Sequence, residues 1–160
     1  MNVLFLTPHL PYPPNQGAKL RNYALIHAVA SRHEVDLLTF GSPQLVASEI
    51  DHLRSFCRNV MLVAPPERSP YQRLRQALTS PLPDIAYRLA SEPFAAALAE
   101  ALANDYDVVQ VEGIEMAPYL LQVARKERRP RLIFDEYNAE YVLQRRIFQT
   151  DLRSPRRWVG

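Results

Sequence analysis

Polar side chains crowd into one short stretch late in the chain, residues 135–141. Its seven residues include three carboxylates, one amide and two phenols: Asp135, Glu136, Tyr137, Asn138, Glu140 and Tyr141. An Asn at a helix start can cap the free backbone N–H groups, which accounts for Asn138 alone. Capping leaves the other polar groups of this stretch without a structural explanation. We therefore interpret this stretch as a candidate functional site.

A second candidate follows the first apolar run of the chain. Prolines stiffen residues 8–14, and Gly17 lets the backbone come close to a ligand where a helix begins. Free N–H groups at a helix start favour an anion such as a phosphate, and Lys19, Arg21 and Asn22 can add side-chain contacts. An ordinary turn glycine beside solvated basic groups explains the same residues, so both interpretations stay open.

A third candidate is the pair of carboxylates in the sequence Glu112-Gly113-Ile114-Glu115, which follows the apolar run 108–111. A Glu at a strand end can hydrogen-bond a substrate hydroxyl, and Gly113 allows close approach. Acidic side chains near a helix start are also stabilised by the helix dipole alone. This signal is the weakest of the three.

The elements that position these candidates follow from five apolar runs, at residues 3–6, 35–40, 60–63, 108–111 and 132–134. Continuous β-branched and aromatic runs are typical of strands buried on both faces of a parallel sheet. The segments between them have helical spacing, with Ser91 and Pro93 at the start of one helix and Pro118 at the start of another. The pattern predicts a doubly wound, Rossmann-like α/β fold. Ligands bind beyond the carboxyl ends of such strands, where all three candidates would lie.

Several classes of function lack the residues they need. The chain has four glycines and neither a G-x-G-x-x-G nor a P-loop motif, so no dinucleotide fingerprint is available. No metal site is expected, because the four histidines lack close ligand spacing and Cys57 has no cysteine partner. A net charge of +2 does not indicate nucleic-acid binding. No signal peptide and no membrane-spanning run is evident, and a lone cysteine fits a reducing compartment, so we expect a cytoplasmic domain.

A short proline-flanked segment, residues 71–78, is amphipathic. Tyr71, Leu74 and Leu78 share one side of the predicted helix, with Arg73 and Arg75 beside them. A basic amphipathic helix can lie on a membrane surface, and we expect peripheral contact with the inner face of the plasma membrane as one possibility. The other possibility is that the apolar side packs on the domain.

The opening of the chain resembles that of family 4 glycosyltransferases, especially bacterial enzymes of exopolysaccharide and lipid-linked glycan synthesis. The resemblance rests on the opening run Met1-Asn2-Val3-Leu4-Phe5-Leu6-Thr7-Pro8, then Pro11-Tyr12-Pro13-Pro14, Gly17 and Arg21-Asn22-Tyr23. His33-Glu34-Val35 is similar to the second strand of that family. The turn Asp135-Glu136-Tyr137-Asn138-Ala139-Glu140 is similar to its D-x-H-N-x-E motif, with Tyr137 in place of the histidine.

The resemblance implies a retaining GT-B enzyme that needs no bound metal or cofactor and transfers a sugar from a nucleotide-sugar to a glycan or lipid-linked acceptor. Residues 1–152 would be its N-terminal, acceptor-side domain, and residues 153–160 would lead to a second domain that binds the donor. By position, the resemblance places three residues at the catalytic centre, Tyr137, Asn138 and Glu140. It places six along the substrate path: Gly17, Lys19, Arg21, Asn22, Glu112 and Asp135. We expect the chain alone to be inactive.

Two other interpretations stay open. The chain could be a non-catalytic subunit that binds an acceptor or a membrane and recruits a separate catalytic partner. It could also be a flavodoxin-like binding module, for which no cofactor motif is present. A reading frame that continues past Gly160 with an E-x(7)-E motif would favour the transferase, and a stop codon there would favour the subunit.

Overall fold

The protein is built on a five-stranded, all-parallel sheet with the strand order β3-β2-β1-β4-β5. The computed structural model describes residues 1–42, 47–79, 84–125, 130–136, 142 and 145–146. The strands are β1 (Asn2–Thr7), β2 (Glu34–Phe40), β3 (Asn59–Val63), β4 (Val108–Glu112) and β5 (Arg131–Asp135). The helices are α1 (Gly17–Ala30), α2 (Ala47–Arg54), α3 (Pro70–Thr79), α4 (Glu92–Ala101) and α5 (Ala117–Ala124), with 3-10 turns η1 (Asp84–Tyr87) and η2 (Ile114–Met116). The predicted doubly wound, Rossmann-like fold is confirmed.

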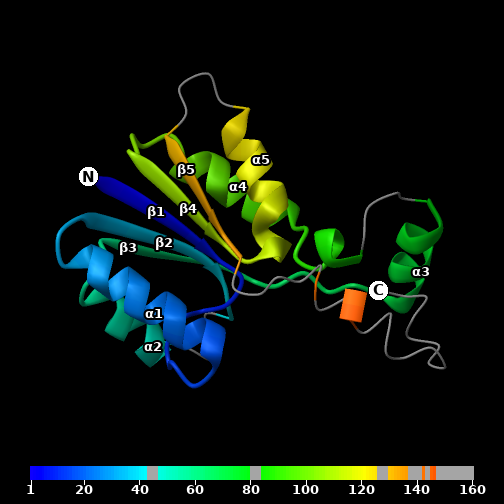
Figure 1. The fold of residues 1–160 in the computed structure, drawn as a ribbon, viewed down its shortest axis with the longest axis horizontal. Helices are drawn as coiled ribbons and strands as arrows, with labels where there is room; N and C mark the ends of the chain where they lie inside the picture. The colour runs from blue at the N-terminus through cyan, green and yellow to red at the C-terminus, as the bar shows by residue number, and fades with distance from the viewer. Residues whose placement is uncertain (43–46, 80–83, 126–129, 137–141, 143–144, 147–160) are drawn as a thin grey trace.

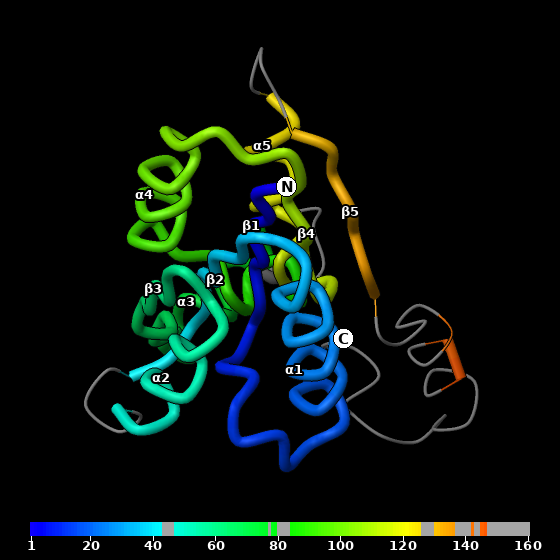
Figure 2. The backbone as a smooth tube through the Cα atoms, turned by 90° about the vertical axis from the view of Figure 1, so that its left-hand side faces the viewer, coloured from blue at the N-terminus to red at the C-terminus, as the bar shows by residue number. Residues whose placement is uncertain are grey.

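Helices cover both faces of the sheet, α1 and α2 on one side and α4 and α5 on the other (Figures 1 and 2). Successive residues of β1 point to opposite faces. Val3 and Phe5 pack with Ile26 of α1, and Leu4 and Leu6 belong to the core under α4 and α5. Burial on both faces explains why the strands read as continuous apolar runs rather than alternating ones.

Helix α4 begins where its sequence indicates. The hydroxyl of Ser91 accepts a hydrogen bond from the backbone N–H of Phe94 at 3.3 Å, and a proline lies in the first turn. This satisfies one of the N–H groups that a helix start leaves free. Phe94 and Leu98 are then carried on the buried face of the helix, where Phe94 stacks on Phe40 of β2 with ring centroids 4.3 Å apart.

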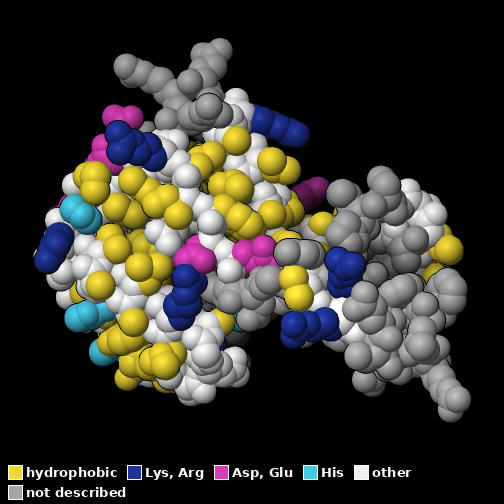
Figure 3. Space-filling model, viewed as in Figure 1, with side chains coloured by type: hydrophobic (Ala, Val, Ile, Leu, Met, Phe, Trp, Pro, Cys, Tyr) yellow, Lys and Arg dark blue, Asp and Glu magenta, His cyan; other side chains and the backbone are white. Residues whose placement is uncertain are grey.

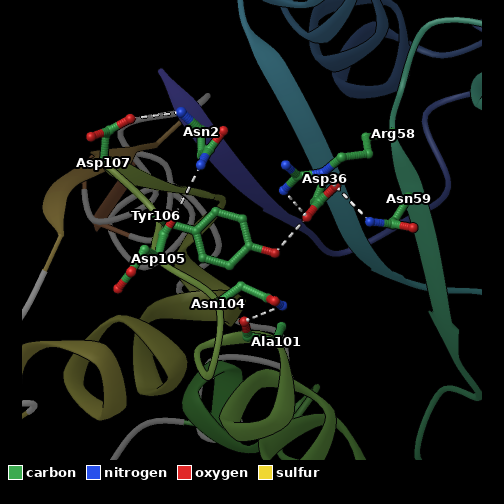
Figure 4. Close-up of polar contacts among 9 residues, drawn as sticks. All are labelled: Asn2, Asp36, Arg58, Asn59, Ala101, Asn104, Asp105, Tyr106 and Asp107. Atoms are coloured by element: carbon green, nitrogen blue, oxygen red, sulfur yellow. Dashed lines mark hydrogen bonds and ion pairs between the residues drawn. The ribbon is translucent and has the colours of Figure 1, made fainter.

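A buried polar cluster joins β2, β3 and the start of β4 near the amino ends of the strands (Figure 4). Asp36, which is 1% exposed, accepts two hydrogen bonds from Arg58, at 3.0 and 2.7 Å. Asn59 and Tyr106 donate to the same carboxylate at 3.0 and 2.6 Å. These four hydrogen bonds offset the cost of burying the charge, so the cluster stabilises the sheet at the edge where its strands begin.

Helix α3 stands apart from the sheet (Figure 1). Its apolar residues Tyr71, Leu74 and Leu78 are 73%, 59% and 77% exposed. The expectation that this side packs on the domain is therefore wrong. The physical reason is that the domain holds the opposite, polar side of the helix, through the ion pairs of Arg68 and Arg73 with Asp84.

Candidate functional site

The candidate site lies at the carboxyl ends of the strands, around the neighbouring strands β1 and β4. Helix α1, which follows β1, packs on one face of the sheet, and α5, which follows β4, packs on the other. The chain therefore leaves these two strand ends in opposite directions, which makes this point the topological switch of the sheet. Ligands of open parallel sheets bind at such a switch point.

Three of the predicted residues meet at this edge. Arg21 of α1 forms ion pairs with Glu112 at the end of β4, at 3.4 Å, and with Asp135 at the end of β5. The two carboxylates are register partners on adjacent strands. The cation thus connects α1 to two strand ends.

Glu112 is an acid with no exposed surface. Its Oε1 accepts a hydrogen bond from the side-chain amide of Gln110 at 2.6 Å. Burial raises the pKa of Glu112, Asp135 adds to the rise, and the Gln110 hydrogen bond and Arg21 only partly oppose it. Glu112 therefore keeps its proton to a higher pH than an exposed glutamate does. Perturbed acids of this kind are common at functional sites.

A pocket of about 400 Å³ lies at the carboxyl ends of β1, β2 and β3. The start of α1 contributes Gln16 and Lys19, so Lys19 lines the pocket and Arg21, two residues later, reaches the carboxylates. The other lining residues are Pro8, His9, Leu10, Phe40, Gly41, Pro65 and Leu89. Few polar groups within an otherwise apolar lining are typical of small-molecule sites.

His9 is the titratable ring of this pocket. Its backbone is held in place because the hydroxyl of Thr7 donates to the His9 carbonyl oxygen at 3.0 Å and lies 2.8 Å from the hydroxyl of Thr39. Burial lowers the pKa of His9, Glu115 opposes this, and the nearby cations Lys19 and Arg88 lower it further. The imidazole is therefore neutral at neutral pH and can accept a hydrogen bond from a hydroxyl group.

The start of α1 is open toward this region. No side chain caps the helix, and its first turn contains no acidic residue. A methyl group placed on Gly17 would meet no atom within 4 Å. An uncapped helix start without acidic neighbours is open to an anion, so anion binding at this point stays a prediction. Within the described residues, no close contact requires a glycine at position 17.

The remaining predicted residues fall into two groups. Asn22 lies on the inner side of α1 and is only 3% exposed, so it faces the domain interior rather than the open edge. Tyr137, Asn138 and Glu140, predicted for the catalytic centre, lie outside the described residues. The structure therefore brings Arg21, Glu112 and Asp135 into contact and places Lys19 in the pocket of His9. The catalytic roles of Tyr137, Asn138 and Glu140 stay predictions.

Sequence reasoning missed His9 as a site residue. It was considered only as a metal ligand, for which no histidine partner is nearby in sequence. The signal that could have found it is its position two residues after the end of β1, since loops at that edge form the ligand crevice. Among the described residues, no group of three or more His, Cys, Asp or Glu side chains could hold a metal ion. Within the same part of the chain, every helix is too short or too polar to cross a bilayer.

Comparisons of this chain with protein-family profiles, with curated protein sequences and with solved structures found no match.

Proposed function

We propose that this chain is the acceptor-binding domain of a retaining glycosyltransferase of the GT-B type, which transfers a sugar from a nucleotide-sugar to a glycan or lipid-linked acceptor. The observation that carries the proposal is that Arg21 is held between Glu112 and Asp135 at the same edge of the sheet as the pocket that Lys19 lines. A sugar acceptor presents many hydroxyl groups and, when lipid-linked, a phosphate. Carboxylates, a guanidinium and an ammonium group at one edge of the sheet suit both.

Each side chain has a part in this proposal. Lys19 and the uncapped start of α1 bind the phosphate of the acceptor, and Gly17 leaves room for it. His9, as a neutral imidazole, accepts a hydrogen bond from the acceptor hydroxyl. Glu112 and Asp135 orient Arg21 at this edge of the sheet. The nucleotide-sugar is bound mainly by a second domain, and closure of the two domains excludes water from the donor.

The first test is ligand binding to the chain, followed by nuclear magnetic resonance. The acceptor probes are a short-chain lipid diphosphate sugar and the free sugar, and the donor probes are UDP-glucose and GDP-mannose. The proposal predicts saturable shifts at His9 and Lys19 with the lipid diphosphate sugar, weaker shifts with the free sugar, and no turnover of the donors. A Lys19→Ala variant should weaken binding of the phosphate-bearing probe about tenfold, the loss of one charge-assisted contact.

Two outcomes would contradict the proposal. Turnover of a nucleotide-sugar by this chain alone at an enzyme-like rate would refute the two-domain account. Failure of every acceptor probe to bind would show that this chain does not hold the acceptor site. Sequencing the native reading frame past Gly160 gives an independent check, because the proposal expects a further domain with an acidic E-x(7)-E motif.

A non-catalytic subunit that binds acceptor or membrane is the second candidate function. The observation in its favour is the exposed apolar side of α3, which an acceptor pocket does not require. A reading frame that stops after Gly160, together with acceptor binding by the chain alone, would favour this candidate over the transferase.

A further inference from the structure

Helix α3 has its polar side toward the domain and its apolar side toward solvent. Arg68, just before the helix, is 14% exposed and forms an ion pair with Asp84 of η1 at 2.7 Å. The same guanidinium donates to the side-chain oxygen of Gln76 at 2.7 Å. Arg73 lies 4.0 Å from Asp84. These polar contacts hold α3 in an orientation opposite to that of an ordinary surface helix.

The start of α3 is also well defined. The hydroxyl of Ser69 accepts from the backbone N–H of Gln72 at 3.2 Å, and the side chain of Gln72 accepts from the backbone N–H of Ser69 at 3.0 Å. This reciprocal pair is a capping box, which stabilises a helix without any apolar packing. The helix therefore forms and keeps its orientation while its apolar side stays uncovered by the described part of the chain.

The uncovered side is a stripe made of Tyr71, Leu74 and Leu78, which we call the α3 stripe. Its residues are spaced three and four apart, so they lie above one another along the helix, and each is more than half exposed. Figure 3 shows hydrophobic side chains at the outer edge of the part of the molecule that carries α3. Single exposed leucines are common, but an aligned set on a projecting helix indicates a contact surface.

The charge of α3 indicates what the surface contacts. The helix carries two arginines and no acidic residue. Arg75 is exposed and lies on the flank of the stripe, one residue after Leu74. An apolar stripe with a cationic flank complements an anionic lipid surface, where leucine and tyrosine enter the interface and arginine contacts the headgroups. An apolar patch on a partner protein would not require the arginine.

We propose that α3 is a membrane-contact helix, and that the α3 stripe inserts into the interface of a bilayer rich in anionic lipid, with Arg75 on the headgroups. This surface docks the domain at the membrane with α3 parallel to the bilayer plane. It does not depend on the proposed transferase function, because the contact requires only the helix and its anchoring by Arg68 and Asp84.

The test is flotation of the whole chain with vesicles of phosphatidylglycerol mixed with phosphatidylcholine, and with vesicles of phosphatidylcholine alone. We expect binding to the anionic vesicles that weakens as salt is added. The double variant Leu74→Ser, Leu78→Ser should lower the partition coefficient at least about tenfold, since both exposed side chains lose their transfer into the interface. Arg75→Gln should lower it about fivefold on anionic vesicles only.

Matched control variants distinguish binding through the α3 stripe from non-specific binding to vesicles. Leu121 of α5 is 59% exposed, as is Leu74, and Arg54 of α2 is an exposed arginine on a different helix. Leu121→Ser and Arg54→Gln should each leave vesicle binding within about twofold of wild type. Far-ultraviolet circular dichroism and thermal unfolding verify that all variants are folded.

Three results would overturn the inference. The first is no binding of the wild type to anionic vesicles at low salt. The second is an equal loss of binding in the control and stripe variants. The third is a concentration-dependent dimer that the double serine variant abolishes, which would assign the stripe to a second copy of the chain.

Discussion

The guanidinium of Arg21 lies 3.4 Å from the carboxylate of Glu112, although 91 residues separate the two in the sequence. Arg21 is 44% exposed and Glu112 is completely buried, so the arginine connects an interior acid to the open edge of the sheet. A buried acid beside a half-exposed cation responds both to pH and to a ligand that competes for the cation.

Glu112→Gln should make the free energy of unfolding depend less on pH. The folded state raises the pKa of Glu112, mainly through burial. Between the ordinary glutamate pKa and the raised one, the folded protein binds more protons than the unfolded chain. Stability therefore falls as pH rises through this window, and glutamine removes the effect. Urea unfolding at a series of pH values measures it. Glu100→Gln, an exposed acid on α4, should keep the wild-type slope; equal slopes in both variants would contradict the prediction.

His9 should titrate below the ordinary histidine pKa of 6.5. Burial lowers the pKa of His9, and the cations Lys19 and Arg88 act in the same direction while Glu115 opposes them. Lys19→Gln should therefore raise the midpoint, and Glu115→Gln should lower it. Ring-proton resonances followed against pH measure all three midpoints. A wild-type midpoint above 6.5, or shifts of the opposite sign in the variants, would show that the ring is not in this environment.

Arg58→Met should destabilise the fold by about 3 kcal/mol, because it leaves the carboxylate of Asp36 buried with fewer hydrogen bonds. This value is at the low end for a buried pair, since Arg58 is 37% exposed. Arg54→Met is the matched control, because its ion pair with Asp51 is exposed and 3.7 Å long, and it should cost less than about 0.5 kcal/mol. Chemical denaturation of both variants provides the comparison, and similar losses would contradict the prediction.

The same cluster predicts a loss of stability in acid. Burial raises the pKa of Asp36, but hydrogen bonds from Arg58, Tyr106 and Asn59 outweigh burial and the net pKa is lowered. A lowered carboxyl pKa contributes stability above the ordinary aspartate pKa, and the contribution is lost as pH falls through the folded value. Tyr106→Phe removes one of these hydrogen bonds. It should cost about 1–2 kcal/mol at neutral pH and less in acid, as thermal unfolding at both pH values would show.

Gly17→Ala should separate ligand binding from folding. The added methyl group meets no atom within 4 Å, so the free energy of unfolding should change by no more than about 1 kcal/mol, in the stabilising direction. Binding of the lipid diphosphate sugar should fall at least about tenfold if the acceptor approaches this backbone. Gly41→Ala is the contrast, because its methyl group would lie 2.5 Å from a methyl carbon of Leu62 and should destabilise the fold by about 1 kcal/mol. If the Gly17→Ala variant binds the lipid diphosphate sugar as tightly as the wild type, Gly17 is not part of the binding site.

Arg68→Gln should loosen α3 without unfolding the sheet. It removes the ion pair with Asp84 and the hydrogen bond to Gln76, which together hold the polar side of the helix. Local opening should become easier by about 2 kcal/mol, so amide hydrogen exchange in residues 70–79 should accelerate while β1 and β4 stay protected. Unchanged exchange in α3 would show that other contacts hold it.

Much of the fold could be predicted from local sequence patterns. The five strands and the starts of α4 and α5 lie within one or two residues of the expected positions, because apolar runs, Ser91 and the prolines act on their immediate neighbours. The same patterns placed Lys19, Arg21, Glu112 and Asp135 at one sheet edge. They did not indicate that Arg21 would contact both carboxylates, because such a contact depends on how α1 lies against β4 and β5.

The amino-acid sequence by itself determined the element order, the two-sided burial of the sheet and the edge at which the strands end together, since these follow from hydrophobic periodicity and from the geometry of parallel strands. Only the tertiary structure decided that His9 lines a pocket, that Glu112 is fully buried and that α3 faces solvent with its apolar side. Periodicity identifies the apolar side of a helix such as α3. Contacts between residues that are distant in sequence decide which side of the helix lies against the domain. In α3 the deciding contact is the ion pair of Arg68 with Asp84.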